Sequence, residues 1–175
     1  GAPQKGGSYA ADLRYVGGVV TERAPLLTRE CLVVGKSTVP VGTAERLAGI
    51  ITDLAPVGDL AELAWNPEFL REGFAVADTT SPDRIVIGVR STEAEKVLRE
   101  VYAQMLDKSI PMLVTDYATA ELVKVAANAF LATKISFINA MAEVCEATGA
   151  DVGMLAEAIG HDDRIGRRFL GAGIG

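Results

Sequence analysis

Short apolar runs that alternate with helix-forming segments constrain the fold of this chain more than any other feature. The helix-forming segments have polar residues at regular intervals, and turn residues separate them from the apolar runs. This alternation predicts an α/β fold, the second part of a doubly wound parallel sheet. The predicted strands lie at 31–34, 61–65, 84–89 and 111–115, and the predicted helices at 10–27, 43–54, 93–106 and from 66 onward.

A long segment without proline or glycine follows the last predicted strand. It runs from Asp116 to Thr148, and its apolar residues keep a helical period. At 1.5 Å per residue, such a helix is about 50 Å long, as in helices that bridge domains or form a dimer spine. Gly149 is placed to end it. We therefore divide the chain into 1–115, a connecting helix at 116–148, and 149–175, where two short helices and a glycine-rich tail are expected.

Composition excludes several classes of protein. The net charge of -6 argues against a nucleic-acid binder, which needs a basic face. No stretch approaches 18 uninterrupted apolar residues, so we expect no membrane span. Cys31 and Cys145 are isolated and predicted to be buried thiols, which suits a reducing cytoplasm. His161 is the only histidine, so no metal site is expected, and we assign it to the surface.

Two groups of polar residues follow predicted strands. Thr38 stands where the first strand ends, the edge at which doubly wound sheets bind ligands. From the residues alone, a polar turn between strand and helix is the simpler interpretation. After the second strand, Asn66 and Pro67 predict a helix start, with Glu68 and Glu72 on one face. Such a helix N-terminus suits a diphosphate. Spacing alone favours the simpler interpretation, two acids that satisfy the helix dipole.

Two further groups lie on or after the long helix. Lys124 and Asn128 are four residues apart in small apolar surroundings and could stabilise negative charge on an oxygen. The alternative is a surface ion pair between Glu121 and Lys124. Farther on, three arginines could bind phosphate or form a solvated cluster; they are Arg164, Arg167 and Arg168. No Gly-x-Gly-x-x-Gly follows a strand, and the tail Gly171–Gly175 comes after a helix.

Five segments carry a further signal: Gly35-Lys-Ser-Thr-Val-Pro-Val-Gly-Thr43, Asn66-Pro-Glu-Phe-Leu-Arg-Glu-Gly73, Ser81-Pro-Asp-Arg-Ile-Val-Ile-Gly88, Glu121-Leu-Val-Lys-Val-Ala-Ala-Asn-Ala-Phe-Leu-Ala132 and Asp163-Arg-Ile-Gly-Arg-Arg-Phe-Leu170. In their order and spacing they resemble the UDP-glucose/GDP-mannose dehydrogenase family. The run at 126–139 is more similar to the UDP-glucose branch. The resemblance implies a Rossmann-like NAD-binding domain, a dimerisation helix and a central helical domain. It also implies a double oxidation of a nucleotide sugar, from alcohol to aldehyde to carboxylate, with NAD.

The resemblance also implies catalytic roles. Glu68 matches the glutamate implicated in hydrolysis of a thioester intermediate. Lys124 and Asn128 match the pair that steadies the oxyanion, and Thr38 matches a threonine that contacts NAD and orders a water. These four residues are expected to converge on one cleft.

Binding roles follow from the same match. Glu72 corresponds to a second glutamate near NAD, and Arg164 to an arginine that reaches the substrate across a homodimer built on the 116–148 helix. The UDP-sugar is expected to contact the loop after the second strand and the long helix; the residues are Glu68, Phe69, Leu70, Arg71, Glu72, Lys124 and Asn128.

The chain departs from the family pattern at both ends. The glycine loop that opens the family's first domain is missing, Ala2 stands where a threonine is common, and the family's Gly-Gly-Ser-Cys segment would follow Gly175. We therefore expect an interior fragment that is inactive by itself. The alternatives are a dehydrogenase for GDP-mannose or a UDP-amino sugar, and a non-catalytic dimerisation or sugar-nucleotide-binding module.

Overall fold

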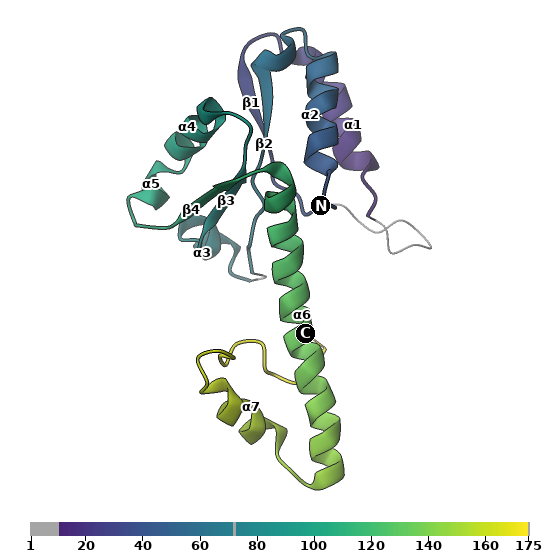
Figure 1. Ribbon diagram of the computed structural model, residues 1–175, viewed down its shortest axis with the longest axis vertical. Coiled ribbons are helices and arrows are strands. Elements are labelled where there is room, and N and C mark those ends of the chain that lie inside the picture. The colour runs from purple at the N-terminus through teal and green to yellow at the C-terminus, as the bar shows by residue number, and fades with distance from the viewer. Residues whose placement is uncertain (1–10, 72, 175) are drawn as a thin grey trace. The chain divides into compact units, whose positions relative to one another are not determined.

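The computed structural model describes residues 11–71 and 73–174. The chain divides into two compact units, Gly1–Val125 and Ala126–Gly175. The first contains a four-stranded sheet with helices packed against it, and the long helix α6 begins in it (Figure 1). The predicted α/β fold class is confirmed.

The sheet has the strand order β1-β2-β3-β4. Its strands are β1 (Cys31–Gly35), β2 (Ala61–Trp65), β3 (Ile85–Gly88) and β4 (Met112–Thr115). The pairs β1–β2 and β3–β4 are parallel, whereas β2 and β3 meet in antiparallel orientation at Trp65 and Gly88. The sheet is therefore mixed, and the parallel order expected from the sequence holds within each pair. The β2–β3 connection carries one short helix, α3 (Ala75–Thr80).

Two helices cover the β1–β2 side of the sheet. The helix α2 (Thr43–Leu54) packs on β2, and α1 (Arg14–Arg23) packs on α2 (Figure 1). Leu47 and Ile51, one helical turn apart, are buried in the core of this layer. The helix expected at 10–27 is shorter: it begins at Arg14, whose N–H donates to the Asp12 carboxylate at 3.1 Å, and it ends at Arg23, shortly before Pro25. Short 3-10 turns occur at Ala24–Leu26 and Gly58–Leu60.

A second core lies beside β3. The helix α4 (Thr92–Val101) buries Leu98 against Ile85 and Ile87. The Ser91 hydroxyl accepts the Ala94 N–H at 3.0 Å and caps this helix. The single helix expected at 93–106 is interrupted at Tyr102, after which α5 (Ala103–Leu106) follows.

The predicted long helix is present as α6 (Tyr117–Thr148). The Asp116 carboxylate accepts the Thr119 N–H at 2.7 Å and caps it. A Cβ atom on Gly88 would lie 2.8 Å from the Asp116 carbonyl oxygen, so the glycine allows β3 and the start of α6 to approach closely. By length and composition alone, α6 could also cross a bilayer, a criterion that apolar helices of other kinds meet as well.

The second unit contains most of α6 and one further helix, α7 (Val152–Gly160), where two short helices were expected. Residues 161–174 form turns instead. The Asp162 carboxylate accepts the Arg164 N–H at 3.0 Å, and Gly166 has φ 69°, so local bonding and a left-handed residue break the helical pattern. Asn139 on α6 exchanges two 2.8 Å hydrogen bonds with Gly173.

Both cysteines are free thiols. Cys145 is buried, as expected, whereas Cys31 is only partly buried.

Candidate active site

The helix expected to start at Asn66 and Pro67 is absent, and this prediction is wrong. Residues 66–71 leave β2 without helical structure. The Asn66 side chain is committed to tertiary bonds and does not cap the residues that follow it. Its amide nitrogen donates to the Val86 carbonyl oxygen at 2.8 Å, and its amide oxygen accepts from Lys36 Nζ at 2.6 Å. No helix N-terminus is therefore available here for a diphosphate.

Glu68 and Lys124, which are far apart in the sequence, lie together in the first unit. Lys124 Nζ is 3.7 Å from Glu68 Oε1, and the other carboxylate oxygen accepts the Leu70 N–H at 2.6 Å. The Lys124 side chain is 10% exposed and that of Glu68 35% exposed. A largely buried ammonium thus faces a carboxylate that solvent can still reach.

The Phe69 ring lies between two cations. The Arg84 guanidinium carbon is 4.1 Å from the ring centroid, and Lys124 Nζ is 5.4 Å from it. Both distances fall within the range of cation–π attraction. Phe69 thus ties the loop after β2 to the start of β3 and to α6.

Arg71 is held within its own loop. Its backbone N–H, Nε and terminal nitrogen all bond to the Asp78 carboxylate, at 2.8, 3.0 and 2.6 Å. The side-chain hydrogen bond from Arg71 lowers the pKa of Asp78 to about 2, and the same bond raises the pKa of Arg71. Leu70 beside it is exposed. Glu72 lies outside the described residues.

The Arg71–Asp78 pair makes the loop sensitive to acid. The folded-state pKa of Asp78 is below its ordinary value of 3.8, so its stabilising contribution is complete above about pH 4 and is lost as the pH falls toward 2. We expect the melting-temperature difference between the wild type and Asp78→Asn to shrink from pH 5 to pH 2. A difference that stays constant over this range would contradict the assignment.

Thr38 follows β1 on an exposed loop, and its hydroxyl makes no hydrogen bond to another described residue. The Asn66 N–H donates to the Gly35 carbonyl oxygen at 2.7 Å, so the loops carrying Thr38 and Glu68 leave adjacent strand ends. Asn128 lies one helical turn beyond Lys124 on α6, within the second unit.

The arginine-rich segment belongs to the second unit. Arg164 pairs with Asp162 at 2.6 Å, and Arg167 pairs with Glu157 at 2.9 Å. His161 is exposed and contacts both Arg167 and Glu157, which agrees with its assignment to the surface. The predicted site residue Arg164 is thus a solvent-exposed cation, 88% exposed.

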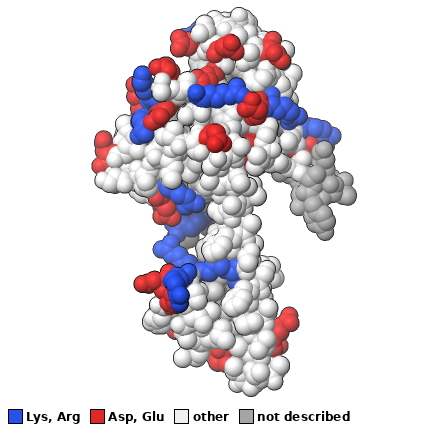
Figure 2. All heavy atoms as spheres, in the orientation of Figure 1, with Lys and Arg blue, Asp and Glu red and all other residues white. Residues whose placement is uncertain are grey.

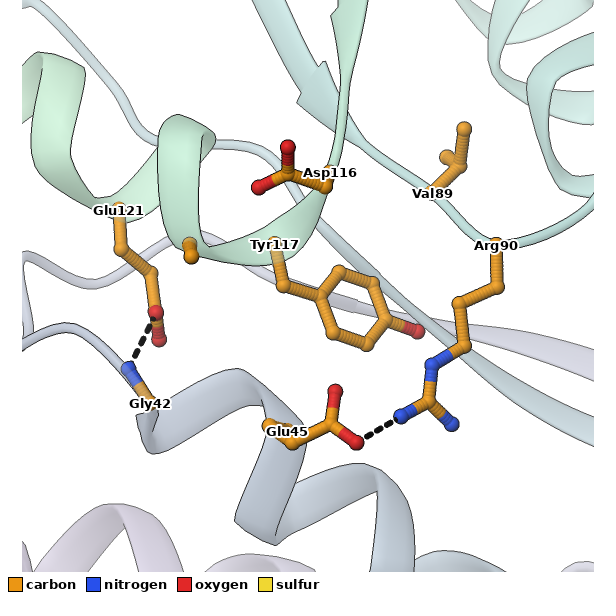
Figure 3. A pocket seen from close by; sticks show the side chains of 8 residues that line it. Gly42, Glu45, Val89, Arg90, Asp116, Tyr117 and Glu121 are labelled. Carbon is orange, nitrogen blue, oxygen red and sulfur yellow. Dashed lines mark hydrogen bonds and ion pairs between the residues drawn. The ribbon is translucent and has the colours of Figure 1, made fainter.

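Glu121 has a role that the sequence did not indicate. It is 1% exposed. One carboxylate oxygen accepts the Gly42 N–H at 2.7 Å (Figure 3), and the other accepts the Ala44 N–H at 2.6 Å. A residue of α6 therefore caps the N-terminus of α2, where backbone donors and the helix dipole favour a carboxylate. The surface ion pair with Lys124 is not formed.

A pocket of about 410 Å³ opens beside this cap (Figure 3). Arg90 forms an ion pair with Glu45 and lies over the Tyr117 ring, whose hydroxyl donates to the Leu63 carbonyl oxygen. Burial raises the pKa of Tyr117 to about 12. The lining groups satisfy one another, so we interpret the pocket as structural; it is lined by Gly42, Glu45, Val89, Arg90, Asp116, Tyr117, Ala118 and Glu121. The described residues contain no cluster of His, Cys, Asp or Glu suited to a metal ion.

The sheet, its polar strand ends and the long helix define a dinucleotide-binding α/β protein of the Rossmann-like class. Residues 1–106 match the NAD binding domain of the UDP-glucose/GDP-mannose dehydrogenase family, and residues 118–175 match the family's central domain. The chain belongs to this family, as the sequence motifs predicted.

Individual relatives agree with this family membership. The chain is 48% identical over 165 residues to the UDP-glucose 6-dehydrogenase of Rickettsia typhi, a match that covers 94% of this chain and 37% of that protein. The UDP-glucose 6-dehydrogenase of Bacillus subtilis is 45% identical over 100% of this chain and 39% of its own length. The chain thus spans well under half the length of these relatives.

Solved structures extend the comparison. A UDP-glucose dehydrogenase from Pyrobaculum islandicum has a TM-score of 0.89 and 42% identity, covering 99% of this chain and 40% of that one. A GDP-mannose dehydrogenase from Pseudomonas aeruginosa has a TM-score of 0.81 and 29% identity, covering 93% of this chain and 38% of that one.

NAD is the cofactor of the matched domain, as expected. The described residues fit part of such a site. Parallel strands β1 and β2 end at a common edge, where doubly wound sheets bind dinucleotides, and the exposed Thr38 hydroxyl at this edge is available to bond. A glycine-rich loop between a strand and a helix is not among the described residues.

Proposed function

We propose that an enzyme of the relatives' full length, containing these residues, oxidises UDP-glucose to UDP-glucuronate with NAD. The observation that carries the proposal is the Glu68–Lys124 pair, 3.7 Å apart, with the ammonium largely buried and the carboxylate partly open to solvent. A cytoplasmic location, where NAD and nucleotide sugars are available, is part of the same proposal.

The pair suits both halves of a four-electron oxidation. Bound NAD would supply the hydride acceptor for both oxidation steps. In each step the oxygen on the reacting sugar carbon loses its proton and carries negative charge before the hydride leaves. Lys124 stabilises that charge, because an ammonium held away from water acts more strongly than one in solvent. Asn128 donates a second hydrogen bond to the same oxygen. The alcohol, one water and two NAD⁺ give the carboxylate, two NADH and three protons.

The carboxylate of Glu68 acts in the hydrolytic half of the proposed reaction. Glu68 takes a proton from the water that hydrolyses the thioester, which forms with the cysteine of the family's Gly-Gly-Ser-Cys segment and not with Cys31 or Cys145. The Thr38 hydroxyl orients that water. Glu68 is anchored through Oε2 to the Leu70 N–H, and Oε1, 3.7 Å from Lys124 Nζ, is the oxygen that takes the proton.

The loop after β2 provides most of the proposed substrate contacts. Arg71 is locked to Asp78, so the loop presents its backbone in a set conformation, and Phe69 is fixed by two cations. Phe69, Leu70 and Arg71 bind the UDP-sugar, together with Glu72, which also contacts NAD. Arg164 reaches the substrate from a second subunit.

A homodimer through α6 belongs to the proposal. Several large apolar residues of this helix are exposed, and most of its surface in Figure 2 carries no charged side chain. An apolar stripe of this kind is typical of a protein interface. Light scattering that shows only a monomer at micromolar concentration would contradict this part. The exposed residues are Leu122, Val125, Phe130, Phe137 and Val144.

Other nucleotide sugars are the alternative substrates. The relatives named for UDP-glucose are 42–48% identical to this chain, against 29% for the GDP-mannose dehydrogenase, and this difference favours UDP-glucose. A solved UDP-N-acetylmannosamine dehydrogenase is 24% identical and informs on the fold alone.

The test is NADH formation by the purified full-length enzyme with UDP-glucose, GDP-mannose and a UDP-N-acetylhexosamine in parallel. We expect turnover with UDP-glucose and a yield of two NADH for each sugar consumed. Preference for another nucleotide sugar would assign the alternative substrate. Absence of turnover with all three would leave only the non-catalytic binding module.

A further inference from the structure

Lys36, Asn66 and Tyr102 form a side-chain network at the ends of β1 and β2. Lys36 Nζ donates to Asn66 Oδ1 at 2.6 Å and to the Tyr102 hydroxyl at 3.1 Å, and the Tyr102 hydroxyl donates to Asn66 Oδ1. The Lys36 ammonium also lies 5.7 Å from the Tyr102 ring centroid. One amide oxygen thus receives two donors, one of them charged.

The network occupies a defined place in the topology. Lys36 is the first residue after β1, and Asn66 is the first residue after β2. Their strands are paired in parallel, and the Asn66 N–H donates to the Gly35 carbonyl oxygen at 2.7 Å. The Lys36 side chain therefore links the roots of two loops, one carrying Thr38 two residues later and the other carrying Glu68 two residues later.

Asn66 connects this link to the rest of the sheet. Its amide nitrogen donates to the Val86 carbonyl oxygen on β3 at 2.8 Å, and the residue is 2% exposed. Tyr102 lies between α4 and α5, so its hydroxyl also joins this part of the chain to the network. A buried amide whose oxygen and nitrogen both have partners rigidifies its surroundings, because an alternative arrangement leaves a polar group without a partner.

We propose that Lys36, Asn66 and Tyr102 are positioning residues that hold the Glu68 loop in a set relation to the Thr38 loop. The proposal rests on the proposed function, in which Glu68 and Thr38 act on the same water. The printed contacts of the three side chains are with one another and with the sheet, so the network acts through the two loops. Its effect is therefore concentrated in the hydrolytic half of the reaction, where the two loops must cooperate.

Tyr102→Phe and Lys36→Met in the full-length enzyme test the proposal. Each removes hydrogen bonds from Asn66 and keeps most of the side-chain volume. We expect kcat to fall about 10-fold, with the KM for UDP-glucose changed less than about 2-fold. The covalent sugar–enzyme adduct should accumulate in mass spectra, because hydrolysis is slowed while the first hydride transfer is not. Tyr15→Phe and Lys96→Met, both at exposed positions, are the matched controls and should behave as the wild type.

A second readout is independent of turnover. Hydrogen exchange of the Leu70 amide, which bonds to Glu68, should be about 10-fold faster in Tyr102→Phe and Lys36→Met than in the wild type. A wild-type enzyme that forms no NADH defeats the proposed function, while the exchange rates still report on the loop. An active wild type whose variants melt earlier but show unchanged kcat, adduct level and Leu70 exchange would overturn the positioning role.

Discussion

Replacement of Lys124 by methionine in the full-length enzyme is expected to lower kcat for UDP-glucose oxidation by about 100-fold to 1,000-fold. Methionine keeps an unbranched apolar stem but removes the ammonium 3.7 Å from Glu68. The oxygen of the reacting sugar carbon then develops charge without its cation in a site that excludes most water. Stopped-flow measurement of the first NADH formed isolates this step from hydrolysis.

The matched control for this variant is Lys96→Met. Lys96 is exposed on α4 and makes only a 3.1 Å pair with Glu93 one turn away, so its loss should leave kcat and melting temperature almost unchanged. If Lys124→Met retained a first-step rate within 3-fold of the wild type while folding normally, Lys124 would have no part in charge stabilisation.

Glu121→Ala is expected to lower the free energy of unfolding by about 2 to 6 kcal/mol, because two backbone N–H groups lose their acceptor. The carboxylate is buried, and both of its oxygens bond to the N-terminus of α2. Its removal also takes away the negative charge that the α2 dipole favours and leaves a cavity between α6 and α2. Urea unfolding monitored through the buried Trp65 measures the loss.

Glu100→Ala provides the comparison. Glu100 is exposed near the end of α4, and its removal should change the unfolding free energy by less than about 0.5 kcal/mol. Equal effects of the two substitutions would show that the Glu121 cap contributes little. The loss of unfolding free energy in Glu121→Gln should lie between the losses in Glu121→Ala and Glu100→Ala. The glutamine amide oxygen still accepts one backbone N–H, whereas its NH2 group is a donor that faces the other N–H.

Several elements could be predicted from local pattern. The helix Thr43–Leu54 and the strand Ala61–Trp65 were expected with the bounds the structure has. In both, the burial of alternate or periodic apolar residues coincides with the intrinsic preference of the segment, so short-range and long-range interactions favour the same structure. The same holds for α6, whose run without proline or glycine leaves no competing local conformation.

The failures lie where local and tertiary bonds compete. Asn66 before Pro67 is a strong local start signal for a helix, but the Asn66 side chain bonds to Lys36, Tyr102 and Val86 and is withdrawn from capping. In the 161–174 segment, the Asp162 carboxylate accepts the backbone N–H of Arg164, and the helical pattern is not continued there. Neither competition can be weighed without knowing which partners are within reach.

The candidate site also contains some residues whose roles the sequence predicted and one whose role it did not. Motif resemblance singled out Glu68 and Lys124, and the topology of strand ends explained why Thr38 and Glu68 should be neighbours. For Glu121 the sequence offered only a surface pair with Lys124 as an alternative, because nothing local reveals that the first turn of α2, 77 residues earlier, needs an acceptor.

The sequence by itself determined the α/β class, the long helix and the family, since each depends on residue periodicity or on motifs that can be read along the chain. Only the tertiary structure decided that β2 and β3 run antiparallel, that Glu121 caps α2 and that Asn66 joins two loops. These outcomes depend on which buried polar groups meet across long stretches of chain, and the cost of leaving any of them unpaired selects the arrangement.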